Sequence, residues 1–119
     1  MKIFIFGVFL IFTLSFCQYS TQPFKEGKVA YDFYCAPCHG TQAEGLSHLY
    51  PGLLDTTYIR SHRTELNNWI RQGISSAQLR HGQTEMPENK KLNDIDIVNI
   101  LNYCNQQFWH LKEEFQLTQ

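Results

Sequence analysis

The sequence predicts a single all-α domain, and three observations support this fold class. Apolar side chains recur at helical spacing in three segments, namely residues 24–34, a stretch that stops at Gly73, and residues 93–104. No β-rich segment is recognised after Cys17, so a sheet is not expected. The segments between the helices contain the glycines and prolines that are typical of loops. A chain of 119 residues suffices for one domain of three main helices joined by long loops.

The first sixteen residues are expected to be an export signal. Lys2 precedes fourteen residues without a charge, which is the layout of a secretory signal, whereas a transmembrane helix needs about 20 apolar residues. The chain is therefore divided into a signal peptide (1–16, cleaved before Cys17), a tether (17–23), a folded domain (24–107) and a C-terminal tail (108–119). The mature chain has nine Lys and Arg against eleven Asp and Glu, a balance that argues against nucleic-acid binding.

The residues at the expected cleavage point, Leu14-Ser15-Phe16-Cys17, resemble a bacterial lipoprotein signal. In such signals the cysteine is acylated and becomes the new N-terminus, so the resemblance implies a lipid on Cys17 and a site at the outer face of the cytoplasmic membrane. Phe16 departs from the pattern, which wants a small residue there, and ordinary cleavage into the periplasm is the alternative. The six residues between Cys17 and the domain reach at most about 20 Å.

The first two helices are predicted from apolar spacing and stop signals. Residues 24–34 form the first helix, and its apolar or aromatic side chains are Val29, Ala30, Phe33 and Tyr34. An irregular loop is expected over residues 40–57. The middle helix is expected to begin near Ser61 or Thr64, with Leu66, Trp69 and Ile70 on one side, and to stop at Gly73, which acts as a helix stop and not as a functional residue.

The last helix begins at Asn93, a favourable N-cap, and Asp94 and Asp96 follow in the first turn, where the helix dipole favours acids. Its apolar positions cover a wide face, which predicts burial on more than one side; they are Ile95, Ile97, Val98, Ile100, Leu101, Tyr103 and Cys104. Cys104 is interpreted as a buried, inert thiol. The aromatic tail after residue 107 either packs back on the domain or docks to a partner, and the sequence does not decide between these.

The segment Cys35-Ala36-Pro37-Cys38-His39 carries the chemistry. Two thiols three residues apart, with a histidine directly after the second, form the attachment signature of c-type haem. Each thiol adds to one of two vinyl groups on the same porphyrin, and His39 is then placed to bind the iron as an axial ligand. We therefore predict one covalent haem c, attached through Cys35 and Cys38.

The cysteines also suggest two other interpretations. Cys-Ala-Pro-Cys also fits a thioredoxin-type dithiol with a depressed pKa, but that fold needs strands around the pair, and the preceding residues show helical spacing. A structural zinc site needs four ligands in compact clusters, and this fails once Cys17 is assigned to the signal. Haem attachment remains the leading hypothesis.

The second iron ligand is predicted by elimination. A low-spin electron carrier usually has a methionine opposite the histidine, and Met86 is the single methionine of the mature chain. It lies in a stretch with glycine and proline that reads as a loop, which suits a ligand that must reach across a haem face. The alternatives are His81 as ligand, an open site, or Met86 as a filler of the core. His48, His62 and His110 are interpreted as ordinary surface or loop histidines.

At this point the chain resembles the class I monohaem cytochrome c family over residues 24–106. The matching positions are Gly27 and Tyr31, Cys35 to Gly40, Tyr50 to Leu53, Ile70 to Gly73, Met86-Pro87, Ile100 and Tyr103. The resemblance implies the cytochrome c fold, in which the first and last helices cross at a glycine packed on an aromatic residue, here Gly27 and Tyr103 with Tyr31 and Ile100 beside them. It also implies that the carbonyl of Pro51 accepts the Nδ1 proton of His39.

The segment 54–60 departs from the family pattern, so the partners of the haem propionates are predicted from chemistry alone. Two buried carboxylates require hydrogen-bond donors, and the available ones near the middle helix are Tyr58, Arg60, Trp69 and Arg71, with Arg80 as a further candidate.

The leading functional hypothesis is a single-electron carrier or relay in an exported respiratory chain, and not an enzyme, because His39 and Met86 together would leave no open iron site for a substrate. The expected partners are a respiratory electron donor and acceptor. The alternatives are a haem protein with a labile Met86 that senses a small ligand or acts as a peroxidase, and a thiol-disulfide oxidoreductase.

Overall fold

The computed structural model describes residues 24–79 and 83–117. The expected signal peptide (1–16), the tether (17–23) with Cys17, and the candidates Arg80 and His81 lie outside the described residues. Within them the order of helical elements is α2 (Lys25–Tyr34), α3 (Ala36–His39), α4 (Thr56–Ser61), α5 (Leu66–Gln72), the short 3-10 helix η1 (Ser76–Gln78), α6 (Asp94–Cys104) and the π-helix η2 (Asn105–Trp109).

The all-α prediction is confirmed. The only extended pairings among the described residues are two isolated antiparallel bridges, one between Leu46 and Tyr50 and one between Ile74 and Met86. None of the described helices has the length and apolar character required to cross a lipid bilayer.

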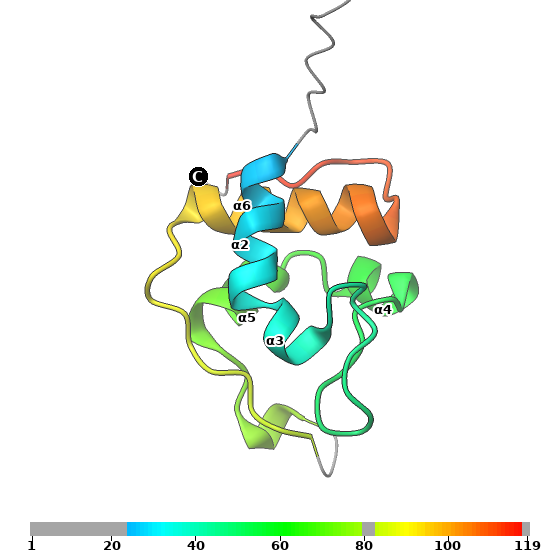
Figure 1. The fold of residues 1–119 in the computed structure, drawn as a ribbon, viewed down its shortest axis with the longest axis vertical. Coiled ribbons are helices and arrows are strands. Elements are labelled where there is room, and N and C mark those ends of the chain that lie inside the picture. The colour runs from blue at the N-terminus through cyan, green and yellow to red at the C-terminus, as the bar shows by residue number, and fades with distance from the viewer. Residues whose placement is uncertain (1–23, 80–82, 118–119) are drawn as a thin grey trace, which may run out of the picture.

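Helices α2 and α6 cross at one end of the molecule, and α2 lies across the face of α6 (Figure 1). A Cβ atom built on Gly27 would lie 2.0 Å from the carbonyl oxygen of Asn99 and 3.0 Å from the Cβ of Tyr103. Only a residue without a side chain allows this approach. The predicted pairing of Gly27 with Tyr103 is therefore present. The carbonyl of Asn99 excludes a side chain at position 27 as well, which was not predicted.

The core of the crossing is aromatic. Tyr31 is fully buried, and its ring centroid lies 5.5 Å from that of Tyr103 and 5.8 Å from that of Phe108. Ile97 and Ile100 of α6 are also fully buried or nearly so. The tilted aromatic contacts are the geometry that ring quadrupoles favour, and they join the two helices to the start of the tail.

The described part of the C-terminal tail packs back on the domain, which is one of the two alternatives that the sequence left open. The side-chain amide of the buried Asn102 donates to the carbonyl of Phe115 at 3.0 Å and its oxygen accepts from the amide of Phe115 at 2.7 Å. The indole nitrogen of Trp109 donates to the carbonyl of Leu53 at 2.6 Å. The Arg63 guanidinium lies 3.9 Å from the centroid of the Phe115 ring. The helical course also continues through η2 to Trp109, beyond the expected boundary at residue 107.

The middle of the chain differs from the prediction. Residues expected to finish a loop form α4, because the Asp55 carboxylate accepts from the amide of Tyr58 at 3.0 Å and caps the helix. The next helix, α5, has Glu65 as its N-cap, so a start near Ser61 was wrong, and the observed cap is the residue directly after Thr64. Local capping chemistry at Asp55 accounts for the extra helix. The predicted stop at Gly73 is confirmed, since this residue is the C-cap of α5.

The start of α6 follows the prediction. Asn93 caps the helix, and its side chain and that of Asp96 bond reciprocally to each other's backbone amides at 3.0 Å. Ile95 departs from the expected buried face, because 61% of its surface is exposed.

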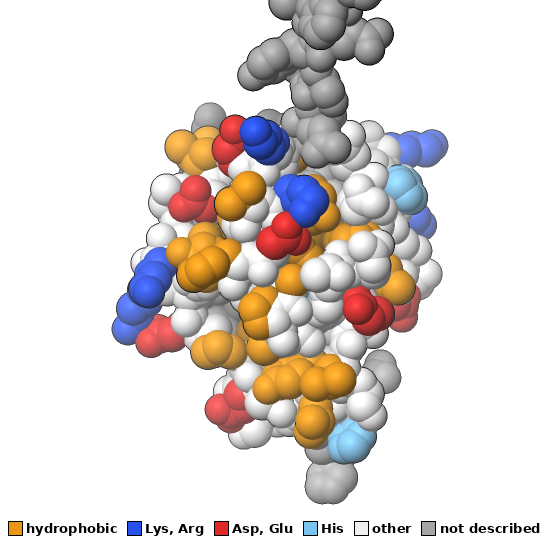
Figure 2. Space-filling model, viewed as in Figure 1, with side chains coloured by type: hydrophobic (Ala, Val, Ile, Leu, Met, Phe, Trp, Pro, Cys, Tyr) orange, Lys and Arg blue, Asp and Glu red, His pale blue; other side chains and the backbone are white. Residues whose placement is uncertain are grey.

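The apolar stripe of α2 faces outward. Val29 is 62% exposed and Phe33 is 71% exposed, whereas Gly27 and Tyr31 on the other side of the helix are buried against α6. Figure 2 shows apolar side chains gathered over α2 on this face. Periodicity therefore identified the helix, but the buried face is set by Gly27 and Tyr31.

Candidate functional site

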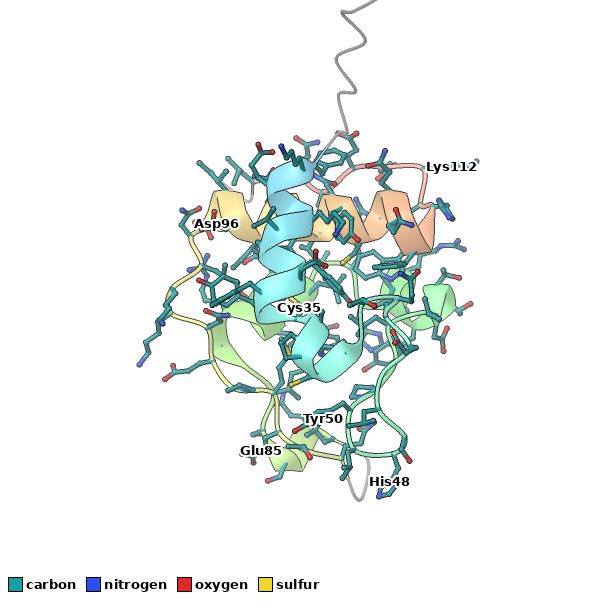
Figure 3. All side chains as sticks on the ribbon, in the orientation of Figure 1. Cys35, His48, Tyr50, Glu85, Asp96 and Lys112 are labelled. Atoms are coloured by element: carbon teal, nitrogen blue, oxygen red, sulfur yellow. The ribbon has the colours of Figure 1, made fainter. Side chains whose placement is uncertain are left out.

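Cys38 and His39, the second attachment cysteine and the candidate axial ligand, lie on the short helix α3, and Cys35 directly precedes this helix. Cys35 is the junction between α2 and α3, and its amide donates to the carbonyl of Tyr31 at 2.9 Å, so α3 continues from the end of α2 (Figure 3). Pro37 stands in the first turn of α3, where its missing N–H leaves no bond unmade. Cys35 and Cys38 are free thiols, three residues apart in the chain.

His39 is oriented by the loop that follows it. Its Nδ1 lies 2.8 Å from the carbonyl oxygen of Pro51. A carbonyl can only accept, so this contact places the proton on Nδ1 and leaves the lone pair of Nε2 free for a metal. The hydroxyl of the buried Tyr31 donates to the carbonyl of Gly40 at 2.8 Å, which holds the backbone directly after His39. The contact expected between His39 and Pro51 is present.

The pKa of Cys35 does not suit a nucleophilic dithiol. Burial, and to a lesser degree the neighbouring Cys38, raise the pKa of the Cys35 thiol to about 12. A thioredoxin-type cysteine requires a depressed pKa, since the thiolate is the nucleophile. This thiol is held neutral, which disfavours the disulfide-exchange hypothesis.

Met86 lies in a segment that is fixed through its backbone to the end of α5. The Ile74 amide donates to the carbonyl of Met86 at 2.8 Å, and the Met86 amide donates to the carbonyl of Ile74 at 3.1 Å. Upstream, the Thr84 amide donates to the carbonyl of Leu49 at 2.9 Å, which joins this segment to the loop that carries Pro51. Figure 3 shows Tyr50 and Glu85, from these two segments, near the end of the molecule opposite α6. The loop that contains Pro51, the partner of His39, and the segment that contains the candidate ligand Met86 are therefore joined by a backbone hydrogen bond.

Gly73 has a role that the sequence analysis missed. Its φ of 78° and ψ of −177° belong to a region that is nearly restricted to glycine, and a Cβ there would lie 2.3 Å from the carbonyl oxygen of Met86. The residue is a helix stop, as predicted, but it is also in direct contact with the candidate ligand segment. The separation of Gly73 and Met86 along the chain gives no reason to expect that they are in contact.

The candidate propionate partners fall into two groups. The rings of Tyr58 and Trp69 lie nearly parallel with centroids 6.2 Å apart, and the His62 ring contacts both. Arg60 is exposed on α4, and Arg71 forms an ion pair with Asp94 at the start of α6. Their roles toward a haem stay predictions, and the Arg71 side chain already has a partner within the protein.

The donor set and the apolar surface fit a haem. His39 keeps one nitrogen for a metal, both thiols are unbonded, and the loop after His39 leaves large apolar side chains exposed. Leu46, Leu49 and Leu54 are 54%, 40% and 53% exposed. Apolar surface of this kind indicates a ligand or partner that covers it. Among the described residues no cluster of three or more His, Cys, Asp or Glu could hold a bare metal ion.

Helices that cross at a glycine, a Cys-Ala-Pro-Cys-His segment and a histidine oriented through its Nδ1 together define a c-type cytochrome. The chain belongs to the cytochrome c family: residues 22–103 match the family described as cytochrome c oxidase, cbb3-type, subunit III. It is also similar to cytochrome c-554(548) of Halomonas halodenitrificans, with 32% identity over 75 residues that cover 61% of this chain and 83% of that protein.

Membership of the family confirms the predicted cofactor, a covalently bound haem c, and the coarse function, electron transfer through that haem. The chain has one Cys-x-x-Cys-His segment, in agreement with one haem. The predicted resemblance to class I monohaem cytochromes c is confirmed as well, over almost the same residues.

Proposed function

We propose that this protein is a single-electron carrier or relay in an exported respiratory chain, with the iron of its one haem held by His39 Nε2 and Met86 Sδ. The observation that carries the proposal is the 2.8 Å contact between His39 Nδ1 and the Pro51 carbonyl, which leaves Nε2 as the ligand atom. When bound, the haem supplies a one-electron couple between ferrous and ferric iron.

The protein's own residues account for the other requirements of a carrier. Pro51 holds His39 in one tautomer and makes it a stronger donor to the metal. The thioether of Met86 is a soft ligand that favours the reduced state. A site with both axial positions filled by side chains has no place for a substrate, so the protein passes electrons and performs no bond chemistry.

The test is the optical spectrum of the protein produced in a host that attaches haem c. The ferric wild type is expected to be low-spin, with the weak far-red band of sulfur-to-iron ligation, and Met86→Ala is expected to lose that band. Glu85→Gln is the matched control, because the neighbouring residue is exposed and the amide keeps an oxygen acceptor for the Ser76 amide. A high-spin wild type that binds small ligands would favour the sensor or peroxidase alternative.

We also propose that the partners are a respiratory electron donor and acceptor and that the mature protein is held at the membrane by a lipid on Cys17. The sequence at Leu14 to Cys17 supports the lipid anchor. Replacement of Cys17 by Ser is expected to move the haem protein from the membrane fraction to the soluble periplasmic fraction. If the variant stays in the membrane fraction, the anchor lies elsewhere.

A further inference from the structure

We propose that Gly73 is a positioning residue for Met86, and that the end of α5 holds this methionine in place before any bond to iron forms. The inference rests on the proposed role of Met86 as the axial ligand. It adds a structural reason why Met86 would keep its coordination position on the iron filled. An electron carrier requires a filled position, whereas a sensor requires an open one.

The first support is the steric fit of Gly73. In addition to the contact with the carbonyl oxygen of Met86, a Cβ at this position would lie 2.8 Å from the amide nitrogen of Glu88 and 2.9 Å from the carbonyl carbon of Pro87. All three neighbours are backbone atoms, which cannot rotate away as the end of a side chain would. Any residue other than glycine must therefore push the segment 86–88 away from α5.

The second support is the hydrogen bonding around this contact. The reciprocal pair between Ile74 and Met86 lies next to Gly73, and the Asn89 amide donates to the carbonyl of Arg71 at 3.1 Å. Three backbone hydrogen bonds thus dock residues 86–89 on the C-terminal end of α5. The ion pair between Arg71 and Asp94 links the same end of α5 to α6.

None of these contacts uses the side chain of Met86. The methionine backbone is held by atoms of Ile74 and fits the space that Gly73 leaves, and none of these backbone contacts occupies the thioether sulfur. The fold thus meets the part of the conformational cost that comes from ordering the Met86 backbone, and this favours the methionine over a competing small molecule.

The first test replaces Gly73 by Ala in the haem-loaded protein. The far-red ferric band is expected to be lost or strongly reduced, and the affinity of the ferric protein for imidazole is expected to rise by about tenfold or more. Asn102→Ala is the control, because it removes two hydrogen bonds to the tail at the other end of the molecule. It is expected to lower thermal stability and keep both the band and the wild-type imidazole affinity. A Gly73→Ala variant with the wild-type band and affinity would overturn the inference.

The second test does not depend on whether Gly73→Ala folds. In Met86→Ala the backbone contacts remain possible, so the amides of Ile74 and of residue 86 are expected to keep their protection from hydrogen exchange. Loss of this protection would mean that the bond to iron places the segment, which contradicts the inference.

The two proposals fail in different ways. A wild-type spectrum without the methionine band rejects the ligand assignment itself. A wild type with the band, a Met86→Ala variant without it and an unchanged Gly73→Ala variant reject only the positioning role.

Discussion

The two ends of this molecule are stabilised by different means. At the helical end, α2, α6 and the tail bury large aromatic and aliphatic side chains, and the buried polar side chains Asn102 and Asn105 are hydrogen-bonded to the tail backbone. At the loop end, residues 40–55, 73–79 and 83–91 are held mainly by backbone hydrogen bonds and short bridges, and several leucines stay exposed. The comparison indicates that the helical end holds most of the buried side chains, whereas the loop end depends on the haem for a core, and we expect the domain to need both in order to fold.

The largest effect is expected from removal of the haem attachment. Replacement of both Cys35 and Cys38 by Ala should leave the exported chain largely unfolded, because a domain of about 100 residues buries little apolar surface without the porphyrin. Far-UV circular dichroism measures the loss of helix, and hydrogen exchange shows which end loses protection. Cys104→Ala, which removes a buried thiol that carries no haem in this proposal, should keep the haem and most of the helix signal. A native-like helical signal in the haem-free chain would show that the helices pack without the porphyrin, and it would contradict this prediction.

The helical end is tested most directly at its crossing point. Gly27→Ala is expected to lower the free energy of unfolding by about 2–3 kcal/mol, because the new methyl group meets the Asn99 carbonyl and the gain in helix propensity offsets only part of that cost. Denaturant titration of the haem protein gives the value. Val29→Ala on the exposed face of the same helix should change it by less than about 0.5 kcal/mol. Equal changes in the free energy of unfolding for the two substitutions would mean that the close approach of α2 and α6 at Gly27 contributes no special stability to the helical end.

The attachment of the tail to the helical end is tested at Asn102. Asn102→Ala removes the buried partner of both backbone groups of Phe115 and is expected to cost about 1–3 kcal/mol of stability. Thermal unfolding checks the loss, and limited proteolysis should cut the tail earlier than in the wild type. The exposed Gln106, replaced by Ala, is the matched control on the following turn. An unchanged melting temperature in Asn102→Ala would show that these two hydrogen bonds to Phe115 add nothing to the stability of the helical end.

The smallest effect is expected at the start of α6. Asn93→Ala breaks the reciprocal capping bonds with Asp96 and should cost about 1 kcal/mol, whereas Asn93→Ser keeps a capping oxygen and should recover most of it. Denaturant midpoints of the three proteins are the measurement. If serine does no better than alanine, the stability of this helix comes from its packing alone.

Much of the fold and of the candidate site was predictable from local patterns. The haem attachment segment, the pairing of Gly27 with Tyr103, the cap at Asn93 and the stop at Gly73 depend on residues that are close in sequence or belong to a family pattern. The extra helix α4 was missed because the cap at Asp55 was not recognised and a loop was expected there. The exposure of Val29 and Phe33 was not predicted, because periodicity shows that a helix is amphipathic but does not show what covers each side.

By itself the sequence determined the covalent chemistry of this protein and the course of its main helices, because thiol spacing, capping residues and apolar periodicity act over a few residues. Only the tertiary structure decided where the tail lies, that the apolar side chains Val29 and Phe33 of α2 stay exposed, and what holds the Met86 segment. Trp109 reaches the carbonyl of Leu53, and Gly73 meets the backbone of Met86, across long stretches of chain. Such contacts depend on the shape of the whole fold, and no local spacing in the sequence encodes them.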